Sequence, residues 1–308
     1  MDTIRCQQLS RTYGEVEALK PLDLTVPEGV IFGFLGRNGA GKTTTIRLIT
    51  GLAQPTTGAA WVNGMATTQT DGTARQQFGY LPQEPAFYTW MTPCEYLDYA
   101  AQIFCIDKKA RQQRIEELLA LVGLEAAAKR PIHGFSGGMK QRLGLAQALI
   151  HRPNVLILDE PMAGMDPAGR RDVIELLERL RGQVTVFFSS HILADVDRVC
   201  DTIGIIHNGE LLLVADRAEL LARYATNAIF LELAHESRAR QEELAACLQT
   251  EAWVTGVLAE NGGLRVMVTN TAVARQALLP LIVQQGIVLN KYDWIRPSLE
   301  DVFLAISG

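Results

Sequence analysis

The sequence contains no long apolar run. A membrane-spanning helix needs about 20 mostly apolar residues, and the best candidate, Val155–Leu158, ends at Asp159. The chain of 308 residues is therefore not expected to cross a bilayer itself. Its first residues also lack the basic-then-apolar order of a secretion signal.

Clustered cysteines and an excess of positive charge are also missing. The five cysteines are scattered without the spacing of a metal site, so a reducing cytoplasm is the expected setting. The formal net charge of -5 offers no overall attraction to phosphate backbones, and nucleic-acid binding is not favoured. The sequence shows neither internal repeats nor low-complexity segments.

The composition is that of an ordinary folded protein, with 48% hydrophobic and 20% charged residues. A single core rarely grows beyond about 250 to 300 residues, so we expect one large and one small domain. Residues 1–222 alternate strand-like and helix-like segments, which predicts an α/β layer fold. The continuous apolar runs at 30–35 and Val155–Leu158 are typical of strands buried on both faces.

The pattern changes in the last quarter of the chain, and 229–308 is predicted to form a small α+β domain. Strands are expected at 229–233, 253–259, 264–269 and 287–294, and helices at 238–249 and 273–285. This βαββαβ order predicts a ferredoxin-like domain. The linker is placed at 224–228. A terminal helix is expected after Pro297, because Ser298 can cap it and Asp301 would lie near its positive end.

A glycine-rich segment directly follows the strand predicted at 30–35, and it matches the P-loop pattern in full: Gly36, Arg37, Asn38, Gly39, Ala40, Gly41, Lys42, Thr43 and Thr44. Glycines let backbone N–H groups turn toward one centre, and the helix beginning near Lys42 adds a positive dipole end. Lys42 then supplies a point charge for the terminal phosphates, and the Thr43 hydroxyl is placed to ligate Mg²⁺.

Two adjacent carboxylates, Asp159 and Glu160, follow the buried strand at Val155–Leu158. Ligands bind at the carboxyl ends of strands in open α/β sheets. Successive residues of a strand point to opposite sides, so we expect Asp159 to face the Mg²⁺ water shell and Glu160 to face an attacking water.

A third segment makes the family assignment specific: Phe135, Ser136, Gly137, Gly138, Met139, Lys140, Gln141 and Arg142. It resembles the signature sequence of ABC ATPases, usually Leu-Ser-Gly-Gly-Gln, and departs from it at Phe135 and Met139. Ser136 and the glycines open a predicted helix, which supplies a second phosphate-facing helix end. The resemblance implies a P-loop NTPase fold of ABC type, with a mixed sheet core and a helical subdomain at about 84–135.

Further positions match the family in order along the chain. Tyr13 matches the aromatic that stacks on adenine, Gln83 the loop glutamine, and His191 the switch histidine. The D-loop of the family is matched by Ala163, Gly164, Met165 and Asp166.

The resemblance implies a site for ATP and Mg²⁺. The implied ATP-binding residues are Tyr13, Gly36, Asn38, Gly39, Ala40, Gly41, Lys42, Thr43, Thr44, Ser136, Gly137 and Gly138. The implied metal ligands are Thr43, Gln83 and Asp159. The residues expected to act in hydrolysis are Glu160, His191, Lys42 and Gln83.

The resemblance also implies partners and a location. Two subunits would close head to tail on ATP, as a homodimer or as a heterodimer with a related ATPase. A separate membrane-spanning permease would be driven from the cytoplasmic, inner face of the membrane. The ending at 297–304 looks like that of a branch that exports drugs, antibiotics, polysaccharides or sodium.

Two alternatives concern the partner. The aromatic loop between Glu84 and Met91 suits a groove for a partner helix, but Phe87, Tyr88 and Trp90 could instead fill the helical subdomain's own core. The chain could also be a soluble ABC-type ATPase that acts on a non-membrane partner, or a non-catalytic nucleotide sensor. The sensor reading is disfavoured because Glu160 and His191 are intact.

Overall fold

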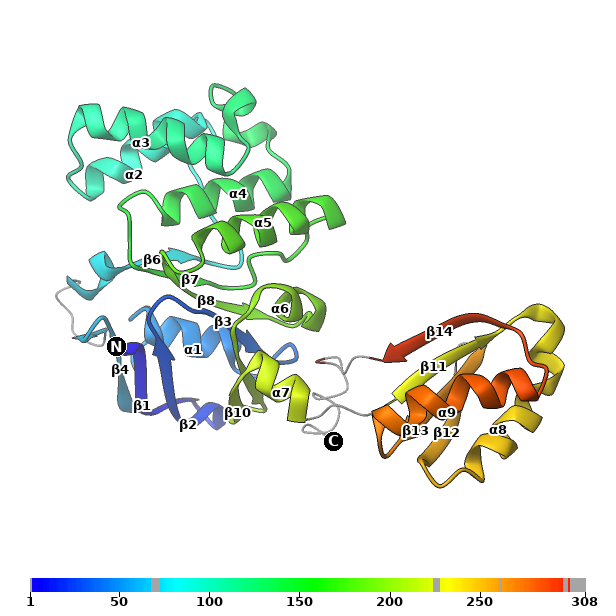
Figure 1. Ribbon diagram of the computed structural model, residues 1–308. Coiled ribbons are helices and arrows are strands. Elements are labelled where there is room, and N and C mark those ends of the chain that lie inside the picture. The colour runs from blue at the N-terminus through cyan, green and yellow to red at the C-terminus, as the bar shows by residue number, and fades with distance from the viewer. Residues whose placement is uncertain (1, 68–72, 224–227, 261, 296–298, 300–308) are drawn as a thin grey trace. The chain divides into compact units, whose positions relative to one another are not determined.

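The computed structural model describes residues 2–67, 73–223, 228–260, 262–295 and 299. The chain divides into two compact units, one running to Ala218 and the other beginning at Glu219 (Figure 1). Residues 224–227 of the linker predicted at 224–228 and nearly all of the predicted terminal helix lie outside the described residues, and Ala228 begins a strand.

Two sheets form the first unit. The first has the strand order β2-β1-β4-β5 and consists of β1 (Asp2–Tyr13), β2 (Val16–Pro27), β4 (Thr57–Val62) and β5 (Met65–Ala66). The second has six strands in the order β10 (Glu210–Asp216), β9 (Thr202–His207), β3 (Ile31–Leu35), β8 (Thr185–Ser190), β7 (Val155–Leu158) and β6 (Phe78–Leu81). Strands β9, β3, β8, β7 and β6 are parallel, whereas β10 is antiparallel to β9. The expected mixed sheet core is confirmed.

Helices cover both faces of the six-stranded sheet. Helix α1 (Lys42–Ile49) lies between the two sheets, and α4 (Gly137–Ala148) and α5 (Pro167–Leu180) lie on the other face (Figure 1). Helices α2 (Pro93–Ile103) and α3 (Lys108–Leu121) pack on α4 and form the predicted helical subdomain. The remaining helical segments of this unit are Thr73–Gln77, Glu125–Ala127, Ile132–Gly134 and α6 (Leu193–Val199). Helix α7 (Arg217–Arg223) begins in this unit and continues into the second one.

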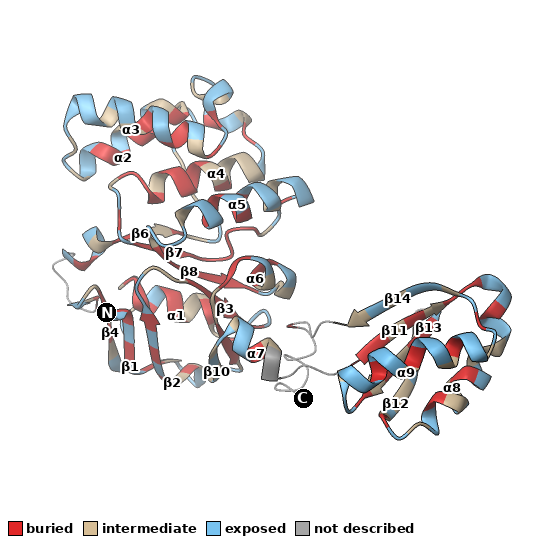
Figure 2. Ribbon diagram, viewed as in Figure 1, coloured by how far each residue is buried: buried red, intermediate tan, exposed pale blue. Residues whose placement is uncertain are grey.

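The core explains why the central strands read as unbroken apolar runs. All residues of β3, β7 and β8 are buried (Figure 2). The Phe187 ring on β8 packs against two rings of β3: its centroid is 5.3 Å from that of Phe32, on which it stacks, and 5.4 Å from that of Phe34, which is tilted. A strand covered by helices on both faces has no solvent-facing side, so polar residues appear only where it ends.

The second unit has the predicted βαββαβ order. Its antiparallel sheet is ordered β12 (Val254–Glu260), β13 (Gly263–Val268), β11 (Ala228–Leu233) and β14 (Leu289–Ile295), with α8 (Gln241–Gln249) and α9 (Thr271–Gln284) as its helices. Buried side chains of both helices pack with alternate strand residues in one core. The helix predicted at 238–249 is preceded by a 3₁₀ segment, His235–Arg240, and its α-helical part begins at Gln241. Helix α9 begins at Thr271, two residues before the predicted start, because Asn270 caps it.

Among the described residues, no helix is both long and apolar enough to cross a membrane.

The close approach of α4 to β6 yields a stability prediction. A Cβ at Gly79 would collide with the backbone carbonyl of Ala148, which cannot move without shifting α4. Gly79→Ala should therefore cost about 2 to 4 kcal/mol of unfolding free energy. Calorimetry should record a Tm for the first unit lower by roughly 5 to 10 °C.

Gly256→Ala is the matched control, because a Cβ on this strand glycine meets only the terminal methyl of Met267, which can rotate away. Equal transition temperatures for Gly79→Ala and the unsubstituted protein would contradict the packing argument.

Candidate functional site

The glycine-rich loop connects β3 to α1 and is held closely by its surroundings. A Cβ at Gly36 would lie 2.5 Å from the carbonyl oxygen of Ile206. Gly41 caps α1 with φ of 108°, and a Cβ there would lie 2.8 Å from the Ala18 carbonyl oxygen. Both positions therefore require glycine. The first N–H groups of an α-helix have no partner within the helix, so the start of α1 can receive an anion.

Lys42 is folded back over this loop. Its Nζ donates to the carbonyl oxygens of Gly36 at 2.8 Å and Arg37 at 3.2 Å, and only 4% of its side chain is exposed. The same Nζ lies 3.1 Å from Glu160 Oε1. The cation is thus held at the mouth of the loop by two carbonyls and one carboxylate.

The carboxylate of Asp159 lies beside the hydroxyl of Thr43, the P-loop residue that follows Lys42. Its Oδ1 accepts from Thr43 Oγ1 at 3.3 Å and from Ser189 Oγ at 2.7 Å. Its backbone N–H donates to Leu81 of β6 at 2.8 Å, which continues the β6–β7 pairing one residue further. Mg²⁺ prefers hard oxygen ligands and commonly takes one or two from the protein, with water and phosphate completing the set. Thr43 and Asp159 fit that requirement.

Glu160 departs from the geometry expected of a strand residue. Strand β7 ends at Leu158, and Glu160 has a left-handed backbone with φ of 50°. The prediction that Asp159 and Glu160 point to opposite sides because they continue a strand is therefore wrong in its reason. The turn of the backbone at Glu160 directs its carboxylate to Lys42 and to His191, whose Nδ1 is 2.6 Å from Oε2.

Five of the predicted residues therefore converge at the carboxyl edge of the six-stranded sheet: Lys42, Thr43, Asp159, Glu160 and His191. Gln83 lies at the same edge, exposed, two residues beyond β6. Asn38 and Gly39 are exposed on the loop, Ala40 is buried, and Thr44 lies in the first turn of α1.

Tyr13 is the last residue of β1 and pairs with Val16 at the start of β2. Ala18 lies two residues further along β2, and its carbonyl oxygen approaches Gly41 of the P-loop. The Tyr13 ring therefore belongs to a hairpin that passes beside the P-loop. Tyr13 is 43% exposed, and the Arg11 guanidinium lies 4.3 Å from the centroid of its ring. Another flat group could stack on it.

The signature residues begin α4, the helix on which the helical subdomain packs. Ser136 is exposed and caps α4 by accepting from the Met139 N–H at 3.3 Å, and neither Gly137 nor Gly138 has an atom within 4 Å of an added Cβ. The structure does not bring this helix end into contact with Lys42 or Glu160 of the same chain.

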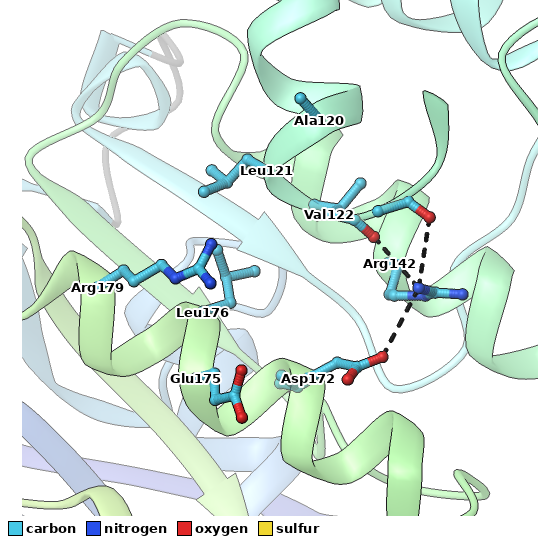
Figure 3. Close-up of a pocket in the computed structure, with 10 residues that line it drawn as sticks. Ala120, Leu121, Val122, Arg142, Asp172, Glu175, Leu176 and Arg179 are labelled. Carbon is cyan, nitrogen blue, oxygen red and sulfur yellow. Dashed lines mark hydrogen bonds and ion pairs between the residues drawn. The ribbon is translucent and has the colours of Figure 1, made fainter. Parts of the chain in front are cut away.

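Arg142 ties this signature helix to two others (Figure 3). Its Nη1 donates to the carbonyl oxygens of Val122 at 3.4 Å and Gly123 at 3.5 Å, at the end of α3, and lies 3.8 Å from Asp172 Oδ2 on α5. A cation at a helix C-terminus also interacts favourably with the helix dipole. The second turn of α4 is thereby anchored to α5 and to the end of α3.

Two residues near the site carry no sequence signal of their own. Ser189 bonds to both Asp159 and the backbone N–H of Glu160. Asp195 is buried near His191, in the first turn of α6, and its Oδ2 has no hydrogen-bond partner in the described part of the chain. Burial raises the pKa of Asp195, and the nearby Glu160 raises it further, against the effects of Arg170 and His191.

The raised pKa of Asp195 predicts a pH-dependent stability. At pH values between the unfolded and the folded pKa of Asp195, the native state binds more protons than the unfolded state. The contribution of Asp195 to the stability of the protein is therefore lost as pH rises through this window. Asp195→Asn removes the buried charge and should raise Tm at neutral pH, with the gain vanishing by about pH 4. Thermal scans across pH measure this.

Asp197→Asn is the control, since Asp197 lies on the same helix, is only partly buried and pairs with Arg217 at 3.3 Å. A Tm gain for Asp195→Asn that is equal at acidic and neutral pH would show that its charge is not the cause.

Family models match both units of the chain. A model described as "ABC transporter" matches residues 19–163, and one described as the C-terminal domain of DrrA1-3-like ATP-binding proteins matches residues 216–306.

Curated relatives match over most of their length. The uncharacterized ABC transporter ATP-binding protein YxlF of Bacillus subtilis is 38% identical over 300 residues, covering 97% of this chain and 98% of the relative. The bacitracin transport ATP-binding protein BcrA of Bacillus licheniformis is 36% identical over 99% of this chain and 97% of its own. The linearmycin resistance ATP-binding protein LnrL of Bacillus subtilis is 35% identical over 73% of each chain.

Solved structures agree with the fold of the first unit. An ATP-binding subunit of an ABC transporter superposes with a TM-score of 0.66 at 31% identity, covering 72% of this chain and 93% of that one. A dimeric ATP-binding cassette bound to ADP and phosphate has a TM-score of 0.64 over 70% of this chain and 98% of its own, and its 24% identity supports the fold alone. The chain therefore belongs to the ABC transporter family, as an ATP-binding subunit with ATPase activity.

Proposed function

We propose that the chain binds Mg·ATP between two subunits and uses hydrolysis to drive export through a separate membrane-spanning partner. The observation that carries the proposal is the convergence of Lys42, Thr43, Asp159, Glu160 and His191 at one edge of the sheet. This arrangement supplies a cation for the phosphates, hard oxygens for a metal, and a carboxylate for water.

Glu160 is the proposed general base. Its carboxylate can accept a proton from a water that attacks the γ-phosphate, and His191 Nδ1, 2.6 Å away, holds that carboxylate in position. Lys42 would exchange its contact with Glu160 for the terminal phosphates, which leaves Glu160 Oε1 available to water.

Thr43 and Asp159 are the proposed metal-binding residues, with Gln83 joining them from the loop that follows β6. Mg²⁺ bound there would neutralise phosphate charge as the terminal phosphate leaves. Within the described residues no cluster of three or more His, Cys, Asp or Glu could hold a metal. Binding would therefore depend on the nucleotide and on water as well as on the chain.

Tyr13 and the signature complete the proposed nucleotide site from different subunits. Tyr13 would stack on adenine, while Ser136, Gly137 and Gly138 would contact the ATP held by the partner subunit. The exposed end of α4 supports this assignment, because a helix N-terminus that faces solvent can receive a phosphate from another molecule. Two such contacts would join a head-to-tail homodimer, or a heterodimer with a related ATPase.

The proposed docking surface for the membrane partner is aromatic. Trp90 and Tyr88 are 70% and 44% exposed, and the Tyr88 ring packs against Trp90 and Tyr99 with centroids 5.0 and 5.8 Å apart. Ile103, 65% exposed, lies one turn beyond Tyr99 on α2. Phe87 differs, since it packs edge-on against the buried Tyr96 inside the helical subdomain. An exposed apolar surface of this kind suits a helix of another protein.

Export is the proposed direction, and the inner face of the cell membrane the proposed location. Support comes from the relatives named for bacitracin transport and linearmycin resistance. We assign ATP hydrolysis to residues 1–222 and an accessory role to 229–308, in line with the separate family models for the two parts.

Replacing the proposed base tests the assignment of Glu160. Glu160→Gln keeps the size and polarity of the side chain but cannot take a proton, so turnover should fall by about 10² to 10⁴ while ATP binding is retained. Steady-state phosphate release and equilibrium ATP binding measure the two effects. Glu178→Gln, at an exposed position of α5, is the control. Near-normal turnover in Glu160→Gln would remove Glu160 from this role.

Trp90→Ala tests the docking surface. Loss of an exposed aromatic anchor should weaken association with the membrane partner by about 30-fold or more, while ATP binding by the chain is retained. The measurement is the fraction of the chain that sediments with membranes containing the partner. Val283→Ala, 75% exposed on α9, is the control. Unchanged sedimentation of Trp90→Ala would place the docking surface elsewhere.

A further inference from the structure

Ser189 is a fully buried hydroxyl that connects the two carboxylate residues of the site. It lies in β8, next to β7, and none of its surface is exposed. Its Oγ donates to Asp159 Oδ1 at 2.7 Å and accepts the backbone N–H of Glu160 at 2.9 Å. A hydroxyl has one hydrogen to donate, and here that hydrogen goes to the carboxylate.

The bond to Asp159 orients the carboxylate expected to face the metal. A hydrogen bond to an ionised acceptor is shorter and stronger than a neutral one. Ser189 and Thr43 both donate to Oδ1, so the carboxylate is held between β8 and the start of α1. Without Ser189 the longer bond from Thr43, at 3.3 Å, would remain.

The bond to Glu160 holds a strained backbone. A left-handed φ of 50° is uncommon for a residue with a side chain, and it persists where surrounding contacts favour it. The Glu160 N–H is buried, and losing its acceptor would leave it unpaired unless the backbone rotated. That rotation would carry the carboxylate away from Lys42 and His191.

We infer that Ser189 is a positioning residue that sets the orientation of Asp159 and the backbone of Glu160 together, through one hydroxyl. The inference rests on the proposed function of the site. The inference extends the proposed function by one residue, which is not expected to touch nucleotide or water and acts through the two carboxylate residues.

Thr185, a second buried hydroxyl residue of β8, has a structural role only and therefore provides a control. Thr185 begins β8, is 1% exposed, and its Oγ1 accepts the Gly29 N–H at 2.9 Å. This bond joins two backbone segments at the opposite end of the strand from the site. Thr185→Val therefore removes a buried hydroxyl from β8 without touching Asp159 or Glu160.

The test compares Ser189→Ala with Thr185→Val in the full chain. Outer-shell partners of a metal ligand are typically worth 10- to 100-fold in affinity or activity. Ser189→Ala should lower kcat by about 10- to 100-fold and weaken ATP binding in the presence of Mg²⁺ by about tenfold. ATP binding in EDTA should not change, because the P-loop and Lys42 are intact.

Ser189→Thr keeps the hydroxyl and should restore most of the turnover and of the Mg²⁺ dependence. Both Ser189→Ala and Thr185→Val should lower Tm, so Tm serves only to show that each variant is folded. The metal-dependent difference in ATP binding is the readout that a purely structural role would not change.

The outcomes separate this inference from the proposed function. If Glu160→Gln hydrolyses ATP at the unsubstituted rate, the proposed function fails. If Glu160→Gln is inactive but Ser189→Ala matches Thr185→Val in kcat and in Mg²⁺-dependent binding, the inference about Ser189 alone is overturned.

Discussion

The buried ion pair between Lys42 and Glu160 is the contact on which the site depends. The two groups are 3.1 Å apart, with 4% and 6% of their side chains exposed. An ion removed from water costs several kcal/mol unless opposite charges and hydrogen bonds compensate. Here the Gly36 and Arg37 carbonyls complete the surroundings of Lys42, and His191 those of Glu160. Glycine in the loop and a left-handed turn at Glu160 are what allow these groups to approach.

In the proposed mechanism the same contact would also prepare the site for hydrolysis. A lysine paired with a carboxylate can exchange that partner for a phosphate with little change in its surroundings, because both are anionic oxygen acceptors. The exchange would free an oxygen of Glu160 for water while His191 still holds the other. Binding of the nucleotide would then also free Glu160 to act as the base. This arrangement suits an ATPase that must hydrolyse ATP only after the nucleotide and the two subunits have come together.

Surfaces outside this site are proposed to serve association. The exposed start of α4, a helix that Arg142 anchors to α3 and α5, suits contact with nucleotide on a second subunit. The aromatic surface formed by Tyr88, Trp90, Tyr99 and Ile103 belongs to the helical subdomain, whose helices α2 and α3 pack on α4. A partner that moved this subdomain would therefore move the signature with it, which offers a physical route between a membrane partner and ATP.

The sequence by itself determined the P-loop, the carboxylates after a buried strand, the signature helix and the βαββαβ order of the second unit. These features depend on residues close together in the chain, where glycine, capping residues and apolar spacing act locally. Only the tertiary structure decided that Lys42 pairs with Glu160, that Glu160 turns left-handed, and that Ser189 binds both carboxylate residues. Those contacts depend on β8 lying between β3 and β7, and this spatial order arises from packing between distant segments, which no local pattern encodes.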